Sequence, residues 1–354
     1  IATSFIKNET IQNKVESICR SNGTKAPIRF MMSCLLAKTH RPELDIRKPY
    51  TEIEGEGTYS GRYYDEAYIQ SFIVEHKLPC NPTTAFLTPA FRTNSRLIEP
   101  GLELNGRPKD LYALVIDLVH VVYQSEVDPQ DLLREIIRVL IIIKHEDEGR
   151  MEQLLSNFRR SDDALPLSSE QIVTLLQQHL SSKHSSRLPV LMVSAAYMSV
   201  RNKIGEKNLP LESHTAADSQ TGALGDLEIS LINDARILTC YEMKDKKVTI
   251  DDINHALSKV AGVPSKPDNY IFITTDVVEK DVENYARSIY EQSGIEVVIL
   301  DCIGFVRHFL HFFHRDRLAF LNIYQELVLS QPISAVGQPL KELFLTLRRA
   351  AETE

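Results

Sequence analysis

The spacing of apolar and polar residues divides the chain into regions of different character. Residues 1–40 carry apolar side chains at helical spacing. Residues 41–108 hold many Pro, Gly, Tyr, Asn and Thr, which predicts loops with short elements. From Lys109 the segments "DLYALVIDLVHVVY" and "DPQDLLREIIRVLIII" return to the i, i+3, i+4, i+7 spacing of amphipathic helices. The first half is therefore predicted to be mainly helical, with a loop-rich insert.

Residues that typically begin and end helices support this division. Asp128 followed by Pro129 is typical of a helix N-cap with Pro at the first helical position. Ser168 and Gln171 have the spacing of a capping box ahead of "EQIVTLLQQHL". The segment "LPVLMVSAAYMSVRNKI" is predicted to be a helix that ends at Gly205.

From about residue 187 the pattern alternates between helices and strands. The segments "LGDLEISLI" and "RILTCYEMK" alternate with a period of two and predict β-strands joined by the turn "NDA". "NYIFITT" and "IEVVIL" predict short buried strands. Helices are predicted after Thr249, up to Gly294 and after Asp301. The order α-β-β-α-β-α-β-α predicts an α/β (α+β) fold in which helices pack on the faces of a mixed sheet.

Ionisable side chains share one face of the predicted hairpin. Because side chains alternate between the faces of a strand, Asp226 lies on the same face as Glu228, and Glu242 on the same face as Lys244. Pairing of the two strands would bring Asp226, Glu242 and Lys244 together at one end of the sheet. Two neighbouring carboxylates repel unless a cation accompanies them. A Mg²⁺ ion accepts one or two carboxylates and lowers the pKa of bound water, and a lysine can orient that water.

This arrangement resembles the PD-(D/E)xK nuclease superfamily, with "GD" as the first motif and "EMK" as the second. The resemblance implies that Asp226 and Glu242 bind Mg²⁺ with the main-chain carbonyl of Met243, and that Lys244 is the catalytic lysine. Gly225 stands where the family's name has Pro. The alternative is a solvated strand edge, because an isolated Glu-x-Lys also arises by chance.

Members of this superfamily often use a further acid from a preceding helix. Glu212 and Asp218 are both candidates, and the choice between them stays open. Glu228 is a third candidate, whose alternative role is to pair with Lys246 or Lys247.

A looser resemblance covers more of the chain. "GTYSGRYYDEAYI" and "NPTTAFLTPAFR", ahead of helices and a late nuclease core, resemble type II restriction endonucleases of the SacI group. That resemblance implies cleavage of both strands of double-stranded DNA at a short specific site, most simply by a homodimer. The alternatives are a repair or junction-type nuclease with the same core, or a sequence-specific DNA-binding protein without activity.

Side chains suited to DNA contact gather in the loop-rich insert. Arginine binds guanine edges and asparagine binds adenine, while lysine and tyrosine contact phosphates. The candidates for DNA binding in the insert are Arg62, Tyr63, Arg92, Asn94, Arg96 and Arg107. Lys246 and Lys247, which follow the second motif, are further candidates, and their alternative is plain surface charge. The alternative is that some of the arginines bind acidic neighbours such as Asp65, Glu66 and Glu99.

Composition and the absence of certain motifs bear on the partners, the compartment and the cofactors that are expected. The net charge of −8 counts against non-specific binding of nucleic acid by the whole surface. Five widely spaced cysteines without a CxxC pair fit a reducing prokaryotic cytoplasm. No apolar run is long enough to span a bilayer. The sequence contains no GxxxxGK[ST] loop, so no nucleotide cofactor is expected.

Three regions are expected along the chain. Residues 1–165 form a mainly helical region that carries the DNA-recognition insert at about 45–108. Residues 166–315 form the nuclease core. Residues 316–354 are helices that pack on the core or at a dimer contact.

Overall fold

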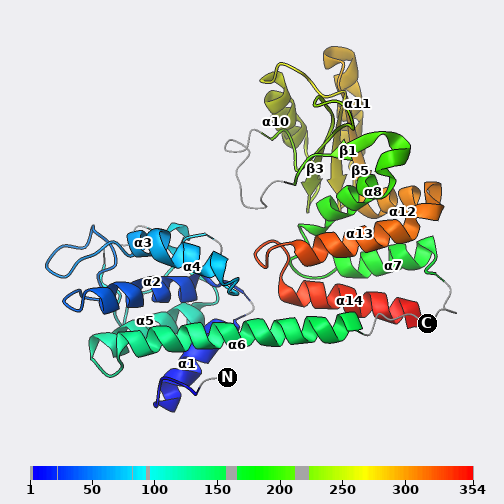
Figure 1. The fold of residues 1–354 in the computed structure, drawn as a ribbon. Helices are drawn as coiled ribbons and strands as arrows, with labels where there is room; N and C mark the ends of the chain where they lie inside the picture. The colour runs from blue at the N-terminus through cyan, green and yellow to red at the C-terminus, as the bar shows by residue number, and fades with distance from the viewer. Residues whose placement is uncertain are drawn as a thin grey trace. The chain divides into compact units, whose positions relative to one another are not determined.

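The structure is a computed structural model that describes residues 3–21, 23–81, 83–92, 96–156, 166–211 and 223–353. The chain divides into two compact units, residues 1–152 and 153–354. Figure 1 shows that the first unit is helical and that the second contains the sheet. No helix among the described residues is long and apolar enough to cross a membrane.

The first unit is built from helices and loops around an apolar core. Its elements are α1 (Glu9–Arg20), α2 (Ala26–His40), α3 (Gly61–Tyr64), the π-helix η1 (Asp65–Ile69), α4 (Gln70–Glu75), the 3₁₀ helix η2 (Ala85–Leu87), α5 (Lys109–Tyr123) and α6 (Pro129–Ser156). Asp128 caps α6 by accepting hydrogen bonds from the N–H groups of Gln130 and Asp131. The predicted loops with short elements at 41–108 match α3 to η2.

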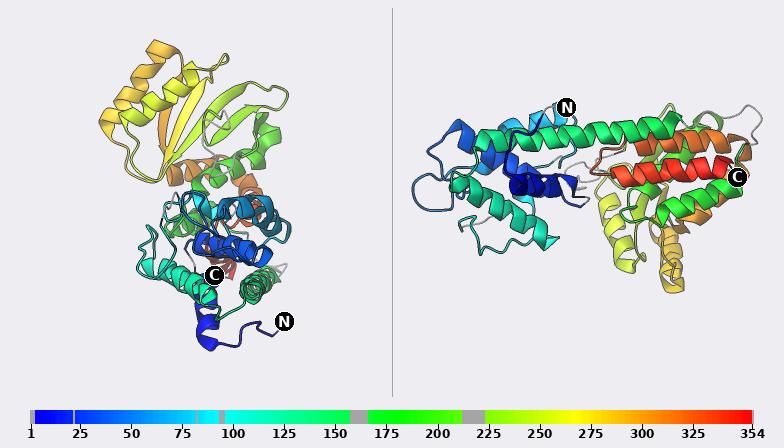
Figure 2. Two further views of the ribbon diagram at one scale, coloured as in Figure 1. Left: turned by 90° about the vertical axis from the view of Figure 1, so that its left-hand side faces the viewer. Right: turned by 90° about the horizontal axis from the view of Figure 1, so that it is seen from below.

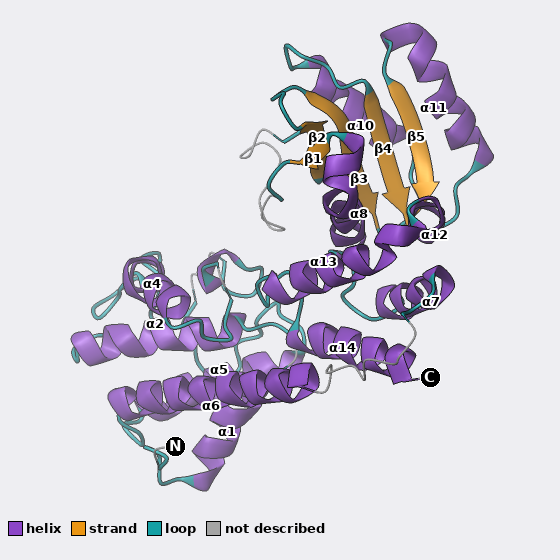
Figure 3. Cartoon of the chain, turned by 45° about the vertical axis from the view of Figure 1, so that its right-hand side comes forward, coloured by secondary structure: helices purple, strands orange, loops and turns teal. Residues whose placement is uncertain are grey.

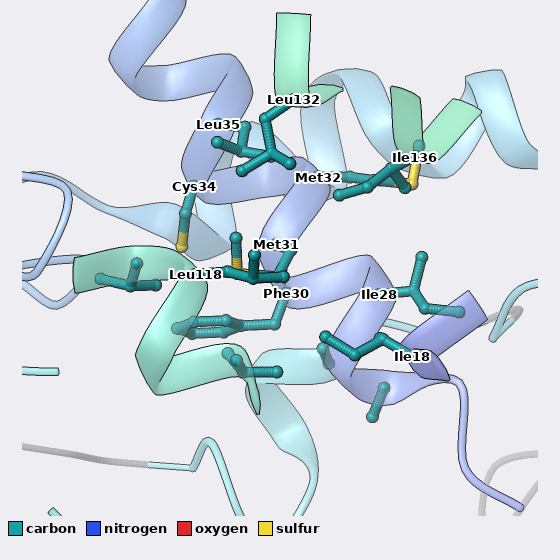
Figure 4. Packing of buried hydrophobic residues seen from close by; sticks show 14 of the residues in the cluster. Ile18, Ile28, Phe30, Met31, Met32, Cys34, Leu35, Leu118, Leu132 and Ile136 are labelled. Carbon is teal, nitrogen blue, oxygen red and sulfur yellow. The ribbon is translucent and has the colours of Figure 1, made fainter. Parts of the chain in front are cut away.

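Helix α2 is buried on nearly every side. Phe30, Met31 and Leu35 are fully buried and pack with residues of α5 and α6, such as Leu118 and Leu132 (Figure 4). Arg29 is also fully buried, and its Nε donates to Asp65 Oδ1 at 2.7 Å. A buried cation of this kind needs such a partner, so this ion pair attaches the π-helix to α2.

The second unit is a five-stranded mixed sheet with helices on both faces. Its elements are α7 (Ser169–Leu180), α8 (Leu188–Ile204), β1 (Glu206–Asn208), β2 (Leu227–Leu231), β3 (Ile237–Lys244), α10 (Ile250–Ala261), β4 (Asn269–Thr274), α11 (Lys280–Ser293), β5 (Glu296–Asp301), α12 (Cys302–Phe312), η3 (His314–Asp316), α13 (Arg317–Ser330) and α14 (Gln338–Thr353). The strand order is β1-β2-β3-β4-β5, antiparallel from β1 to β3 and parallel from β3 to β5. The predicted fold class is confirmed.

Each face of the sheet has its own helices. On one face, Cys240, Tyr270 and Phe272 pack with Ile253 of α10 and Ala286 of α11. On the other face, the hydroxyl of Tyr241 lies 2.9 Å from that of Tyr197 on α8, and the Tyr241 ring contacts Phe305 of α12. The left-hand view of Figure 2 shows α10 and α11 on one side of the strands and α8 on the other.

The predicted helix ends are present. The capping boxes at Ser168 and Thr249 are both formed, and Asp301 caps α12 through the N–H of Gly304. Gly205 and Gly294 end α8 and α11 in the left-handed conformation. Strand β1 was not predicted, because the three residues "EKN" show no apolar alternation.

Candidate active site

The pairing of β2 with β3 places the two predicted carboxylates opposite each other. Leu227 is the register partner of Tyr241, so one step further along each strand sets Asp226 against Glu242. Lys244 follows on the same face of β3. Figure 3 shows β2, β3 and β4 side by side with α10 close to them. Because β3 lies between β2 and β4, Glu242 and Lys244 are on an interior strand and not on an edge strand of the sheet.

A hydrogen bond connects Asp226 directly to the second motif. The main-chain N–H of Met243 donates to Asp226 Oδ2 at 2.7 Å. The next carbonyl, that of Lys244, accepts from Thr275 N–H on the β4 side. Since main-chain groups of successive residues point to opposite edges of a strand, the carbonyl of Met243 points toward β2, where Asp226 lies.

Three elements contribute groups that surround the carboxylate of Glu242. Lys244 Nζ lies 3.3 Å from Glu242 Oε1. On the other oxygen, the hydroxyl of Tyr270 on β4 lies at 3.1 Å and Lys259 Nζ on α10 at 3.7 Å. The Tyr270 hydroxyl also lies 2.8 Å from the carbonyl of Leu224, and its single proton is shared between the two acceptors. Both oxygens of Glu242 are therefore held in place.

Lys244 lies between two acids. Its Nζ is 3.1 Å from Asp252 Oδ1. The other oxygen of Asp252 accepts from the N–H and the hydroxyl of Thr249, at 2.9 and 2.8 Å. Partial burial alone would lower the pKa of Lys244, but hydrogen bonds and charges from Asp252 and Glu242 outweigh it, and the pKa is raised. Lys244 is thus a charged ammonium group that is held between the carboxylates of Glu242 and Asp252.

The close approach of β2 and β3 requires a residue without a side chain at position 225. A Cβ on Gly225 would lie 2.6 Å from the carbonyl oxygen of Tyr241 and 3.2 Å from its carbonyl carbon. Both are backbone atoms of β3 and cannot rotate away. Proline, which the PD-(D/E)xK motif has at this position, also carries a Cβ and would meet the same atoms.

The two motifs fit a hard divalent cation. Among the described residues, no group of three or more His, Cys, Asp and Glu side chains is placed to hold a metal ion. Asp226, Glu242 and the Met243 carbonyl nevertheless form an all-oxygen donor set with two carboxylates. Mg²⁺ usually takes one or two carboxylates from a protein and completes its shell with water and phosphate oxygens. The residues present fit such an ion.

Sequence reasoning missed four residues near this site. Asp252 and Lys259 lie seven residues apart in the helix predicted after Thr249, so both face the sheet from α10. Tyr270 belongs to an apolar strand and gives no separate signal. Arg187 is buried, and its charge interacts with that of Asp226. Burial lowers the pKa of the Arg187 guanidinium, and Asp226 opposes this effect.

The structure places the other predicted acids and lysines differently. Glu228 Oε1 accepts from Leu224 N–H at 2.7 Å and so holds the turn that leads into β2. Lys247 pairs with Glu279 at 2.6 Å, and Lys246 is exposed. Glu212 and Asp218 lie outside the described residues.

The candidates for DNA binding in the first unit are largely at its surface. Arg62 pairs with Glu66, and Tyr63 is exposed with its ring edge against Tyr64 and Tyr68. Arg92, Arg96 and Arg107 are exposed, and Asn94 lies outside the described residues.

Two of the three acidic neighbours bind other arginines. Asp65 pairs with the buried Arg29, and Glu99 pairs with Arg47. Asp65 and Glu99 are therefore paired with arginines outside the candidate set, whereas Glu66 pairs with the candidate Arg62.

Comparison with known families gives a match to the segment that contains these residues. The family model described as the SacI restriction endonuclease C-terminal domain matches residues 165–275. The matched segment runs from α7 to β4 and contains both motifs as well as Asp252, Lys259 and Tyr270. The predicted resemblance to the SacI group is confirmed for this segment. No curated protein matches the chain.

Proposed function

We propose that the chain is a Mg²⁺-dependent, site-specific endonuclease for double-stranded DNA, a type II restriction enzyme of a prokaryotic cytoplasm. The observation that carries the proposal is the meeting of Asp226, Glu242 and Lys244 at one end of the β2–β3 pair. The similarity of residues 165–275 to a restriction endonuclease domain supports it. Hydrolysis of a phosphodiester bond is the reaction that such a set of groups serves.

Each residue has a distinct part in this proposal. Asp226, Glu242 and the carbonyl of Met243 would hold the metal ion. When bound, the ion polarises the phosphate and lowers the pKa of a bound water. Lys244 holds its ammonium group beside Glu242, where it can donate a hydrogen bond to the attacking water or to a phosphate oxygen. Lys259 and Tyr270 hold the far oxygen of Glu242.

DNA contact is assigned to two sets of residues. In the first unit, Arg62, Tyr63, Arg92, Asn94, Arg96 and Arg107 would contact bases and phosphates. In the second unit, Lys246 and Lys247 follow the catalytic strand directly and would contact phosphates near the cut.

A homodimer is the simplest assembly for cutting both strands of a symmetric site, with one active site for each strand. Light scattering coupled to size exclusion should give a protein mass of two chains, both for the free protein and, after the mass of the DNA is subtracted, for the complex. A monomer in both states would contradict the dimer and leave the cleavage chemistry unaffected.

The test of the function is cleavage of mixed plasmid and phage DNA. Wild type should give discrete bands with Mg²⁺ and none with EDTA. Glu242→Ala should give none, whereas Glu291→Ala, a matched change at an exposed position of α11, should cut like wild type. Sequencing the ends of the fragments would identify the site.

Other outcomes would favour the alternatives. Cleavage confined to branched or damaged DNA would favour a repair or junction-type nuclease. Specific binding without cleavage at any Mg²⁺ concentration would favour an inactive DNA-binding protein.

A further inference from the structure

Helix α10 contributes to the site through its N-terminal cap. Asp252 divides its two oxygens between different tasks: Oδ2 accepts from Thr249 and forms the capping box, while Oδ1 lies 3.1 Å from Lys244 Nζ. The cap fixes the side chain of Asp252, so the position of Oδ1 is set by the start of the helix. Residue 252 is only 21% exposed in its side chain, as is Lys244.

We propose that Asp252 is a positioning residue that holds the ammonium group of Lys244 in place for phosphodiester hydrolysis. The proposal rests on the proposed nuclease function and extends it to a residue outside both motifs. Asp252 does not touch the scissile phosphate in this proposal. It acts through Lys244.

The charges around Lys244 explain why a second acid is needed. Without Asp252, Lys244 would keep one of its two carboxylate partners, Glu242 at 3.3 Å. Lys244 would then bind Glu242 more closely and compete with the metal ion for it. Asp252 draws the ammonium toward α10 and leaves Glu242 available to the metal. A flexible lysine side chain has many rotamers, and a second fixed acceptor restricts them.

The chain offers variants that separate positioning from folding. Asparagine is a good acceptor for main-chain N–H groups at a helix N-terminus, so Asp252→Asn can keep the cap while losing the charge beside Lys244. Asp252→Glu keeps the charge and has the residue usual in a capping box. Asp251→Asn removes the same charge from the neighbouring, exposed position of α10 and serves as the matched control.

The experiment measures single-turnover cleavage at saturating DNA, DNA affinity without metal, and Mn²⁺ affinity by calorimetry. Relative to Asp251→Asn, Asp252→Asn should cut at least tenfold more slowly, bind DNA within about threefold, and bind Mn²⁺ at least threefold more weakly. Asp252→Glu should recover part of the cleavage rate. The melting temperature of Asp252→Asn should lie within a few degrees of that of Asp251→Asn, because the cap is kept and only the ion pair with Lys244 is lost.

The failures are distinguishable. If wild type cuts DNA and Asp252→Asn matches Asp251→Asn in cleavage and Mn²⁺ affinity, the inference is overturned and the nuclease function stands. Equal loss in Asp252→Glu and Asp252→Asn would also overturn it, because the charge would then not be what matters. A wild-type chain that neither cuts DNA nor binds Mn²⁺ would overturn both.

Discussion

The main-chain N–H of Met243 donates a hydrogen bond to Asp226 Oδ2 over 2.7 Å, so the first acid of the site is attached to the backbone of the strand that carries the second. Asparagine can accept the same bond. We therefore expect Asp226→Asn to keep the hairpin and lose only the charge. Single-turnover cleavage should fall roughly 100-fold or more, since a metal ligand contributes several kcal/mol to the transition state.

DNA binding should respond in the opposite direction. One negative charge fewer beside the phosphates should leave the metal-free affinity of Asp226→Asn equal to or higher than that of wild type. Asp234→Asn is the matched control, because Asp234 lies after the β2 strand of the same hairpin and accepts a main-chain N–H, that of Arg236, at 3.0 Å. Equal cleavage rates in the two variants would contradict the role of Asp226.

The second prediction is that a side chain at position 225 lowers the stability of the fold. In Gly225→Ala the new methyl group would lie 2.6 Å from the carbonyl oxygen of Tyr241, and β2 would have to move away from β3. Forcing extra volume into a packed region costs about 1–3 kcal/mol. The melting temperature should fall by a few degrees, since roughly 2–4 °C corresponds to 1 kcal/mol in a domain of this size.

Gly262→Ala is the control for that measurement. A Cβ at position 262 would meet its nearest neighbour, the carbonyl oxygen of Lys259, at an ordinary 3.5 Å. The backbone there is right-handed, at φ −81°, so alanine is not strained. A Gly225→Ala variant as stable as Gly262→Ala would show that β2 has room for a side chain.

Lys259 predicts a change in metal affinity. Its ammonium lies 3.7 Å from Glu242 Oε2 and opposes a cation at that carboxylate. Methionine keeps the length and the packing of the lysine stem. We expect Lys259→Met to bind Mn²⁺ about three- to tenfold more tightly by calorimetry, because a like charge has been removed. Lys266→Met, at an exposed position beyond α10, should leave the affinity unchanged. Identical affinities in the two variants would contradict a cation at Glu242.

Arg107 predicts a change in salt dependence. It is exposed in the first unit, just before α5. If it contacts a phosphate, Arg107→Ala should weaken DNA binding and reduce the slope of log affinity against log salt by about 0.9. Arg287→Ala removes an arginine that is 70% exposed and pairs with Glu283 on α11, and it should keep the wild-type slope. If Arg107→Ala and Arg287→Ala have the same salt slope, Arg107 does not contact a phosphate.

The sequence predicted those parts of the site that follow from local geometry. Asp226, Glu242 and Lys244 could be placed together because strand alternation and a short turn determine which side chains share a face. Gly205, Gly294 and the capping boxes mark helix ends through rules that involve a few neighbouring residues.

The remaining site residues depend on packing between distant segments. Tyr270 reaches Glu242 because β4 pairs with β3 in parallel, and a parallel pairing has no hairpin to fix its register. Lys259 and Asp252 reach the site because α10 packs on Cys240 and Tyr270. Likewise, the partner of the buried Arg29 is Asp65, 36 residues away. Local patterns contain no information on such contacts.

His179 gives the fifth prediction, on pH. It is fully buried on α7, with Nε2 3.0 Å from the carbonyl oxygen of Leu340 and Nδ1 3.0 Å from the hydroxyl of Tyr324. A carbonyl only accepts, so Nε2 carries the proton and Nδ1 accepts from Tyr324. A second proton would have to displace that bond. Burial accordingly lowers the pKa of His179 from 6.5 to about 4.

The sign of the effect follows from proton binding. Between pH 6.5 and about 4 the unfolded chain binds a proton at His179 that the folded chain does not, so stability falls as the pH is lowered through this window. The full loss is about 3 kcal/mol at 1.36 kcal/mol for each pKa unit. His179→Gln can keep both hydrogen bonds without titrating. The melting temperature of wild type should therefore fall more steeply than that of His179→Gln between pH 7 and 5, and parallel curves would show that His179 does not set the acid stability.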